Sequence, residues 1–256
     1  MDNQFILSLI TVIFIGGIAG YLGSLMLTKR MALVGGPLGH LALPGAALAL
    51  LYHFNIFWGA LGTIVIGTLI IWLLERRTKL PMEALTGLVF AAGVAFSFLI
   101  LPLSRAEEAL IGDITKINLA DTILAVTLGT IVFFIVKKIY PKMILSGISE
   151  ELAKAEGVDV RKYNLIYLSS IALIVALEVK IVGGLLTVAM LIIPASASNN
   201  FGKNLSRYSL GALAIGIISA VSGILLFKLT GFSVGPLIIL SETLIFLISL
   251  IFKKKL

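Results

Sequence analysis

The chain is a succession of apolar blocks, each about as long as a membrane-spanning helix, and its positive charges gather at alternate ends of these blocks. Fifty-nine per cent of the residues are hydrophobic and 13% are charged. A helix that crosses a bilayer needs about 20 mostly apolar residues, because its backbone polar groups can only be satisfied internally in hydrocarbon. The sequence therefore predicts an all-α, polytopic membrane protein that has the lipid bilayer as a partner.

The apolar blocks predict nine helical segments, at residues 5–28, 31–53, 57–74, 82–102, 119–137, 163–179, 181–198, 207–229 and 233–252. The segment 31–53 is interrupted by Gly and Pro, and the segment 181–198 is short and follows Lys180 with almost no loop. If either is re-entrant, eight segments cross, so we expect eight or nine transmembrane helices. Spans with short connections use up nearly the whole chain, and residues 1–256 are expected to form a single transmembrane domain.

The basic residues predict the orientation of the chain in the membrane. An N-terminus outside the cell leaves four of the 20 basic residues outside, namely Arg105, Lys116, Lys180 and Lys228. Cytoplasmic loops carry an excess of Lys and Arg, so this arrangement is favoured, with the C-terminus in the cytoplasm. The N-terminal residues lack the basic region of a cleavable signal peptide, and the first apolar block is expected to be retained.

Composition and missing motifs exclude several functions. The chain has no cysteine, so it offers neither a disulfide nor a thiolate metal site. In a membrane protein, the net charge of +7 is explained by cytoplasmic loops rather than by a nucleic-acid partner. No phosphate-binding loop is present, since Phe201-Gly202-Lys203-Asn204 does not match one, and no catalytic set suggests a hydrolase. We expect a membrane protein that is not an enzyme and binds no cofactor.

Two polar stretches are not membrane helices. Residues 103–118 carry mixed charges on the otherwise charge-poor outer side, and we expect Arg105, Glu107, Glu108 and Lys116 to contact an external protein. The longer stretch, at residues 140–162, faces the cytoplasm. Within it, residues 149–157 predict a short helix with Ser149 as N-cap, acidic residues in the first turn and Gly157 as the stop. This helix is either a solvated connector or a docking element for a soluble partner.

The stretch Val34-Gly35-Gly36-Pro37-Leu38-Gly39-His40-Leu41-Ala42-Leu43-Pro44-Gly45 places glycines and prolines around one imidazole. Proline removes a helical donor and glycine loosens a helix, so a broken helix is predicted here. Irregular backbone at membrane depth survives where it lines a cavity or is buried in protein, and transporters place substrate sites at broken helices. His40 is therefore either a metal-binding residue of a transport pathway or a core histidine with satisfied hydrogen bonds.

Other ionisable residues within the apolar blocks are few. A carboxylate inside the membrane is costly, so Glu242 is expected either to pair with Lys228 or to line the pathway. Glu178 and His53 lie near the predicted outer ends of their segments, and an interfacial position is expected for both.

Four motifs in order resemble the integral-membrane permease of the metal-type ABC importers, which take up zinc, manganese or iron in bacteria and archaea. They are Gly39-His40-Leu41-Ala42-Leu43-Pro44-Gly45, Leu110-Ile111-Gly112-Asp113-Ile114, the run from Glu151 to Val158, and the run from Val182 to Ala195. The last is similar to the family's Val-Gly-x-Leu-Leu and Pro-Ala pattern. The resemblance covers nearly the full length and implies an ABC importer permease fold in a prokaryotic cell membrane.

The resemblance implies a homodimer, two cytoplasmic ATPase subunits that bind ATP, and an extracytoplasmic solute-binding protein. A coupling segment at about 142–162 would receive the motion of the ATPase, through Glu151, Leu152, Ala153 and Gly157. His40 would contact the transported metal. Glu242, as one of the few ionisable residues inside the apolar blocks, is a second metal candidate.

The chain departs from the family pattern at Gly36. The family typically has Asp four residues before the His of this motif, whereas this chain has Gly36 followed by Pro37. Two alternatives to a metal importer therefore stay open. One is an ABC permease for a non-metal substrate, and the other is a self-sufficient secondary carrier or channel that uses Glu242 and His40.

Overall fold

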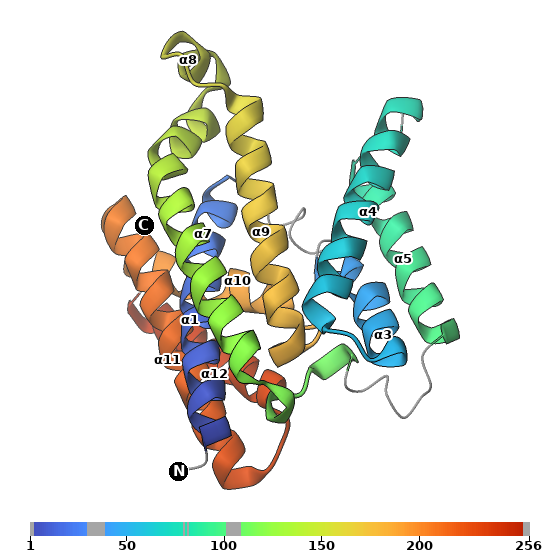
Figure 1. Ribbon diagram of the computed structural model, residues 1–256. Coiled ribbons are helices and arrows are strands. Elements are labelled where there is room, and N and C mark those ends of the chain that lie inside the picture. Colours follow the sequence, from blue (N-terminus) through green and yellow to red (C-terminus); the bar gives the residue numbers. More distant parts are fainter. Residues whose placement is uncertain (1–2, 30–38, 79, 81, 101–108, 253–256) are drawn as a thin grey trace.

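A computed structural model describes residues 3–29, 39–78, 80, 82–100 and 109–252. Within these ranges the regular elements are helices (Figure 1). They are α1 (Asn3–Thr28), α3 (Leu43–Tyr52), α4 (Ile56–Arg77), α5 (Met82–Ile100), η1 (Ile114–Lys116), α7 (Leu119–Ile148), α8 (Glu150–Ala155), α9 (Val160–Val182), α10 (Thr187–Asn199), α11 (Leu205–Thr230), α12 (Val234–Ser249) and η2 (Leu250–Phe252).

Helix α1 lies at the centre of the larger group of helices and packs against α7, α9, α10 and α11. Small residues permit the closest approach, since a Cβ atom on Gly16 would lie only 2.8 Å from the Gly216 carbonyl oxygen of α11. Lipid tails are as apolar as leucine, so close backbone packing at small residues is a main source of association between membrane helices. The glycines of α1 and α11 thus place the core around α1.

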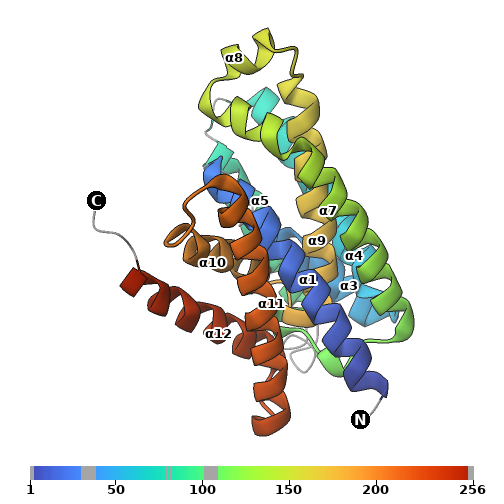
Figure 2. The same cartoon turned by 90° about the vertical axis from the view of Figure 1, so that its left-hand side faces the viewer.

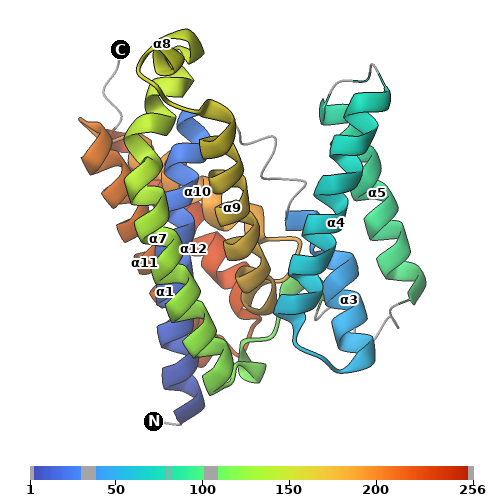
Figure 3. The ribbon, with the colours of Figure 1, turned by 45° about the horizontal axis from the view of Figure 1, so that its top comes forward.

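Helices α3, α4 and α5 form a second group, which lies beside the first in Figures 1 and 3. Helix α4 joins the two groups through its contact with α9. Helix α12 packs on α10 and α11 and then runs away from the rest of the bundle towards the C-terminal end, as Figure 2 shows. The α3–α5 group carries many exposed apolar side chains, including Ile66, Leu69 and Leu73, as expected of a lipid-facing surface.

The predicted all-α membrane fold is confirmed. In the described ranges, six helices are long and apolar enough to cross a membrane, and three shorter apolar helices span Gly39–Tyr52, Ala84–Ile100 and Thr187–Asn199. Each of the nine predicted segments corresponds to one of these helices. The expected number of eight or nine transmembrane helices is therefore compatible with the structure.

The predicted end of the fifth segment at residue 137 is wrong, because α7 continues to Ile148. The charges of Lys137 and Lys138 suggest an end there, but a charged turn does not stop a helix that still has a surface to pack on. Tyr140 and Met143 beyond it are buried, and even Pro141 is accommodated within the helix. Much of the stretch 140–162 is therefore helical and continuous with a membrane segment.

The predicted break at Lys180 is also misplaced. Helix α9 runs through Lys180 to Val182, and the chain turns at Gly183, which has a φ of +74°. Glycine adopts this backbone conformation without the steric cost that a Cβ atom would bring. The seventh segment consequently begins at Thr187, and α10 is a short helix of 13 residues.

Candidate functional site

The turn that carries His40 directly precedes α3. Gly39, His40 and Leu41 are helical, and Ala42, with a φ of −73° and a ψ of −24°, continues the helical backbone into α3. Pro44 stands in the first turn of α3 and has no backbone N–H to donate. Pro44 therefore removes one backbone hydrogen bond here, but the backbone stays helical from Gly39 into α3, and the break predicted at Pro44 is not present as a change of direction. The other part of the predicted break, Gly35-Gly36-Pro37, lies outside the described residues.

The imidazole of His40 is only partly satisfied by its surroundings. Its ring centroid lies 4.5 Å from that of Phe90 in α5, and the backbone of Gly184 is a hydrogen-bonding neighbour of the ring. Its Nδ1 atom is buried and has no hydrogen-bond partner. A buried imidazole nitrogen without a partner remains available to a proton or a metal ion.

Thr187 is a second unsatisfied polar residue at this junction, and it was not predicted from the sequence. Its side chain is fully buried, and its Oγ1 atom has no hydrogen-bond partner. The hydroxyl lies so close to Gly39 that a Cβ atom there would collide with it. Its one sequence signal is that it is the only hydroxyl residue between Val182 and Ala195. The start of α10 thus meets the turn that carries His40.

The ligands available near His40 are few. Across the described ranges, no group of three or more His, Cys, Asp or Glu side chains could hold a metal ion. Within the described part of one chain, a metal at His40 would therefore not meet three such protein ligands.

Two of the sequence motifs come together next to the contact between the start of α10 and the turn that carries His40. The Gly184 N–H donates to the Ala109 carbonyl over 3.0 Å, and the Asp113 N–H donates to the Lys180 carbonyl over 3.1 Å. Gly112 adopts a φ of +78°, and the backbone of Gly183 packs directly on the 110–111 peptide. The motif at 110–114 and the turn at 183–186 therefore form one unit, which places Gly184 beside His40.

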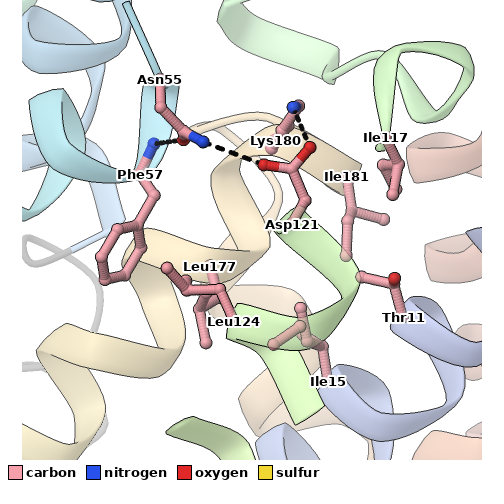
Figure 4. A pocket seen from close by; sticks show the side chains of 11 residues that line it. Thr11, Ile15, Asn55, Phe57, Ile117, Asp121, Leu124, Leu177, Lys180 and Ile181 are labelled. Carbon is pink, nitrogen blue, oxygen red and sulfur yellow. Dashed lines mark hydrogen bonds and ion pairs between the residues drawn. The ribbon is translucent and has the colours of Figure 1, made fainter. Parts of the chain in front are cut away.

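A buried ion pair links three helices at the same end of the molecule (Figure 4). Lys180 of α9 pairs with Asp121 of α7, and both side chains are 15% exposed or less. Asn55, the N-cap of α4, donates to Asp121 over 3.0 Å. Asp121 also forms a capping box with Asn118. Its carboxylate therefore satisfies the start of α7 and ties the α3–α5 group to the larger group of helices.

The predicted contact segment is described only in part. Arg105, Glu107 and Glu108 lie outside the described residues. Lys116 is exposed in η1 and forms an ion pair with Asp113 over 3.7 Å. Asp113 in turn accepts the N–H and the hydroxyl of Thr115 over 2.9 Å and 2.6 Å. The described end of this segment is thus an ordered polar turn beside the buried ion pair.

Glu242 of α12 and Glu178 of α9 lie on helices that pack against each other, within range of each other's charge. Both side chains are fully buried, although an interfacial position was predicted for Glu178. That prediction is wrong, because the side chain points into the packing of α9 rather than towards water. Ser219 of α11 donates to Glu242 Oε1 over 3.4 Å, whereas Lys228 lies over the ring of Phe5. The expected pairing of Glu242 with Lys228 is therefore not present.

Glu242 and His40 have different neighbours. Those of Glu242 come from α9 and α11, whereas those of His40 come from α5 and the turn before α10. His53, by contrast, is exposed at the end of α3, and its interfacial position stays a prediction.

The predicted cytoplasmic helix is α8. The Leu152 N–H donates to the Ser149 side chain over 3.1 Å, as expected of an N-cap, and Gly157 follows the helix with a φ of +74°. Leu152 is exposed, as are Glu151 and Gly157, whereas Ala153 is buried among residues of α7 and α9. Ala153 therefore holds α8 in place, and the neighbouring residues form its accessible surface.

A hollow of about 390 Å³ opens beside α8. It is lined by Glu150, Lys154, Val158, Asp159, Val160, Arg161 and Asn164. Lys29, at the end of α1, donates to Ser146 and Asn164 over 3.0 Å each. Burial lowers the pKa of Lys29, and the nearby Glu150 opposes this shift. The base of α8 is thus tied to α1, α7 and α9.

Comparisons with known proteins identify relatives of this chain. The chain is 27% identical over 246 residues to the manganese import system permease protein ScaB of Streptococcus gordonii. The aligned region covers 94% of this chain and 88% of ScaB. It is 27% identical to the high-affinity zinc uptake system membrane protein ZnuB of Buchnera aphidicola, over 97% of the chain and 98% of ZnuB.

A solved structure of PsaBC from Streptococcus pneumoniae in complex with Fab matches the fold with a TM-score of 0.88 at 23% identity, covering 97% of this chain and 91% of that chain. The model of the ABC 3 transport family matches residues 1–253. Together with the nine apolar helices of the described ranges, this match over almost the whole sequence shows that the chain belongs to the ABC 3 transport family.

Proposed function

We propose that the chain is the membrane permease of an ATP-driven importer that translocates divalent transition-metal ions, namely zinc, manganese or iron. The named relatives that import manganese and take up zinc support this cargo. The observation that carries the proposal is the buried, unpartnered Nδ1 of His40, one helical turn before Pro44. Imidazole nitrogen binds divalent transition metals. The metal is cargo and not a resident cofactor.

The proposed assembly contains two copies of this chain, two cytoplasmic ATPase subunits and an extracytoplasmic solute-binding protein. One imidazole is a weak metal site, and two copies would bring two His40 side chains to a shared pathway. Conduction requires a site that binds strongly enough to admit the ion and weakly enough to release it. An incomplete ligand set in one chain suits such a transient site.

We place α8 on the cytoplasmic side, with the N-terminus outside and the C-terminus in the cytoplasm, as the distribution of basic residues favours. Glu151 and Leu152 form the accessible part of α8 and would contact the ATPase. Ala153 would anchor the helix on the bundle, and Gly157 would set the turn that follows it. The polar segment with Arg105, Glu107, Glu108 and Lys116 would contact the solute-binding protein.

The central test replaces His40 with Ala in the assembled transporter. We expect metal uptake to fall by about tenfold or more, as is typical when support for a bound metal is removed. The matched control is His53→Ala, because His53 is the other histidine of the chain and is exposed at the end of α3. Uptake of zinc, manganese and iron would be measured in proteoliposomes and normalised to folded protein.

Unchanged uptake in the His40→Ala variant would refute a metal-binding role for His40. Gly36→Asp restores the carboxylate of the family pattern and is expected to tighten metal binding. A non-metal cargo is the second candidate, favoured by the absence of an acidic residue at position 36. If the unmodified transporter takes up none of the three metals, and none of them stimulates ATP hydrolysis, the second candidate replaces the first. Uptake without any ATPase subunit would instead favour a self-sufficient carrier.

A further inference from the structure

Two carboxyl groups on neighbouring helices are buried inside the bundle, and the proposed metal site at His40 does not use them. Glu178 of α9 and Glu242 of α12 are both fully buried. They are close enough for the charge of one to act on the other. Both side-chain oxygens of Glu178, and Oε2 of Glu242, have no hydrogen-bond partner. Three buried carboxyl oxygens are therefore left unsatisfied on these two residues.

The helices around the pair bring no cation to it within the described ranges. Lys180, two residues from Glu178, pairs with Asp121 of α7. On α11, Lys228 lies over the Phe5 ring of α1, and the hydroxyl of Ser219 is the group that contacts Glu242. Helix α10 carries no titratable residue, and α1 carries only Tyr21.

The other described titratable groups on helices packed against α9 and α12 lie towards helix ends or contact other residues. They are Arg77 of α4, Asp113 and Lys116 of η1 and its N-cap, Lys137, Lys138, Tyr140 and Lys142 of α7, Glu150, Glu151 and Lys154 of α8, Arg161, Lys162, Tyr163 and Tyr167 of α9, and Arg207 and Tyr208 of α11. None of these side chains is an ion-pair or hydrogen-bond partner of Glu178 or Glu242 in the described structure.

We propose that Glu178 and Glu242 form a proton-binding site, in which each carboxyl group holds one proton while α9, α11 and α12 are packed together. An isolated ionised carboxylate is far too costly in a low-dielectric interior, so such a group takes up a proton instead. A second carboxylate nearby makes ionisation less favourable still. Each carboxylate accepts one proton from water as the helices close, and returns it to water when they separate.

This site differs in kind from a metal site. Carboxylate and hydroxyl oxygens could suit a hard cation, but such ions take six or more oxygen ligands. The groups seen here are two carboxyls and the Ser219 hydroxyl. A proton needs no such shell, and it removes the charge that the buried site cannot stabilise. The packing of α12 against α9 and α11 is therefore linked to proton uptake, and acidic pH should favour it.

Infrared spectroscopy of the purified protein in lipid bilayers at neutral pH tests the proposal directly. A protonated carboxyl group gives a carbonyl band distinct from that of a carboxylate, and this band shifts between water and heavy water. We expect the band to fall by about half in Glu178→Gln and in Glu242→Gln, and to vanish in the double variant, since each residue contributes one neutral carboxyl. Glu156→Gln, at an exposed position beside α8, is the matched control and should change nothing.

A second measurement does not depend on the folding of any variant. Carbon-13 labelling of glutamate in the unmodified protein should shift the same band, which assigns it to Glu side chains. Absence of a protonated band in the unmodified protein would overturn the proposal, as would a band that persists in the double variant. Loss of the band on adding manganese or magnesium, in the unmodified protein alone, would overturn it in favour of a cation site.

The measurement uses neither transported metal nor ATP. Its failure would leave the proposed import function intact, and an unchanged His40→Ala uptake would not affect it.

Discussion

At the scale of single residues, hydrogen-bond satisfaction separates structural polar groups from functional candidates. Tyr167 is fully buried and donates to the Leu22 carbonyl over 2.8 Å. Thr11 is also buried and donates to the Thr122 hydroxyl over 2.9 Å. His40 has a buried nitrogen with no partner. Because buried polar groups normally find a partner, such exceptions require an explanation, and a transported ion or a proton supplies one.

The ion pair of Lys180 and Asp121 leads to a stability prediction at the same scale. Lys180→Met leaves the Asp121 carboxylate buried without its cation, and we expect a loss of about 3 kcal/mol in the free energy of unfolding. Chemical denaturation in detergent measures this. Adding Asp121→Asn to Lys180→Met should recover part of the loss. Lys154→Met removes an exposed pair with Glu150 and should have little effect. Equal effects of the two lysine substitutions would contradict the argument.

At the scale of elements, α8 shows how a short helix is held at the end of two long ones. Six residues are too few for a stable isolated helix, so its stability must come from caps and tertiary packing. Ser149 caps its start, and Ala153 packs with Val158 and Val160. A helix fixed in this way can transmit the movement of a bound subunit to α7 and α9.

Gly157 carries the corresponding prediction. Its φ of +74° costs about 1–2 kcal/mol for a residue with a Cβ atom, and more for a β-branched one, although the site itself is open. Gly157→Val should therefore displace α8 and uncouple ATP hydrolysis from transport, with the membrane helices still folded. Gly157→Asn tolerates this backbone conformation and should retain coupling. The ratio of ions transported to ATP hydrolysed, in proteoliposomes, distinguishes the two; a normal ratio for Gly157→Val would refute the role.

At the scale of the whole molecule, two groups of helices meet at α4 and α9, and the Asn55–Asp121–Lys180 contacts join them at one end. The turn that carries His40 belongs to one group, and the Gly184 turn and Thr187 to the other. A relative movement of the groups would therefore open or close the surroundings of His40. This is the geometry that alternating access requires of a substrate site.

The charges of residues 103–118 lead to a prediction for the assembly. Reversing Glu107 and Glu108 together, to Lys, should slow association with the solute-binding protein and change its salt dependence, since rim charges act mainly on the association rate. Surface-binding kinetics at several ionic strengths measure this. Reversal of Glu156, beside α8, is the control and should leave association unchanged. Identical rates in all variants would remove the support for this contact surface.

The membrane class, the nine helical segments and the residue range of α8 could be predicted from the sequence, because they depend on local properties. Hydrophobic length, the positions of basic residues, the Ser149 cap and the Gly157 stop all act within a few residues of one another. The family motifs agreed with the family found by comparison.

Three features could not be predicted from the sequence. They are the end of α7, the burial of Glu178 and Glu242 on neighbouring helices, and the contact of Thr187 with Gly39. Each depends on residues that are far apart in the chain. Glu178 and Glu242, for example, are separated by 64 positions. Local patterns assign a residue to a helix and a depth, but not to the helix that faces it. Burial and hydrogen-bond partners are set by helix packing, and packing is decided by side-chain shapes on several helices at once.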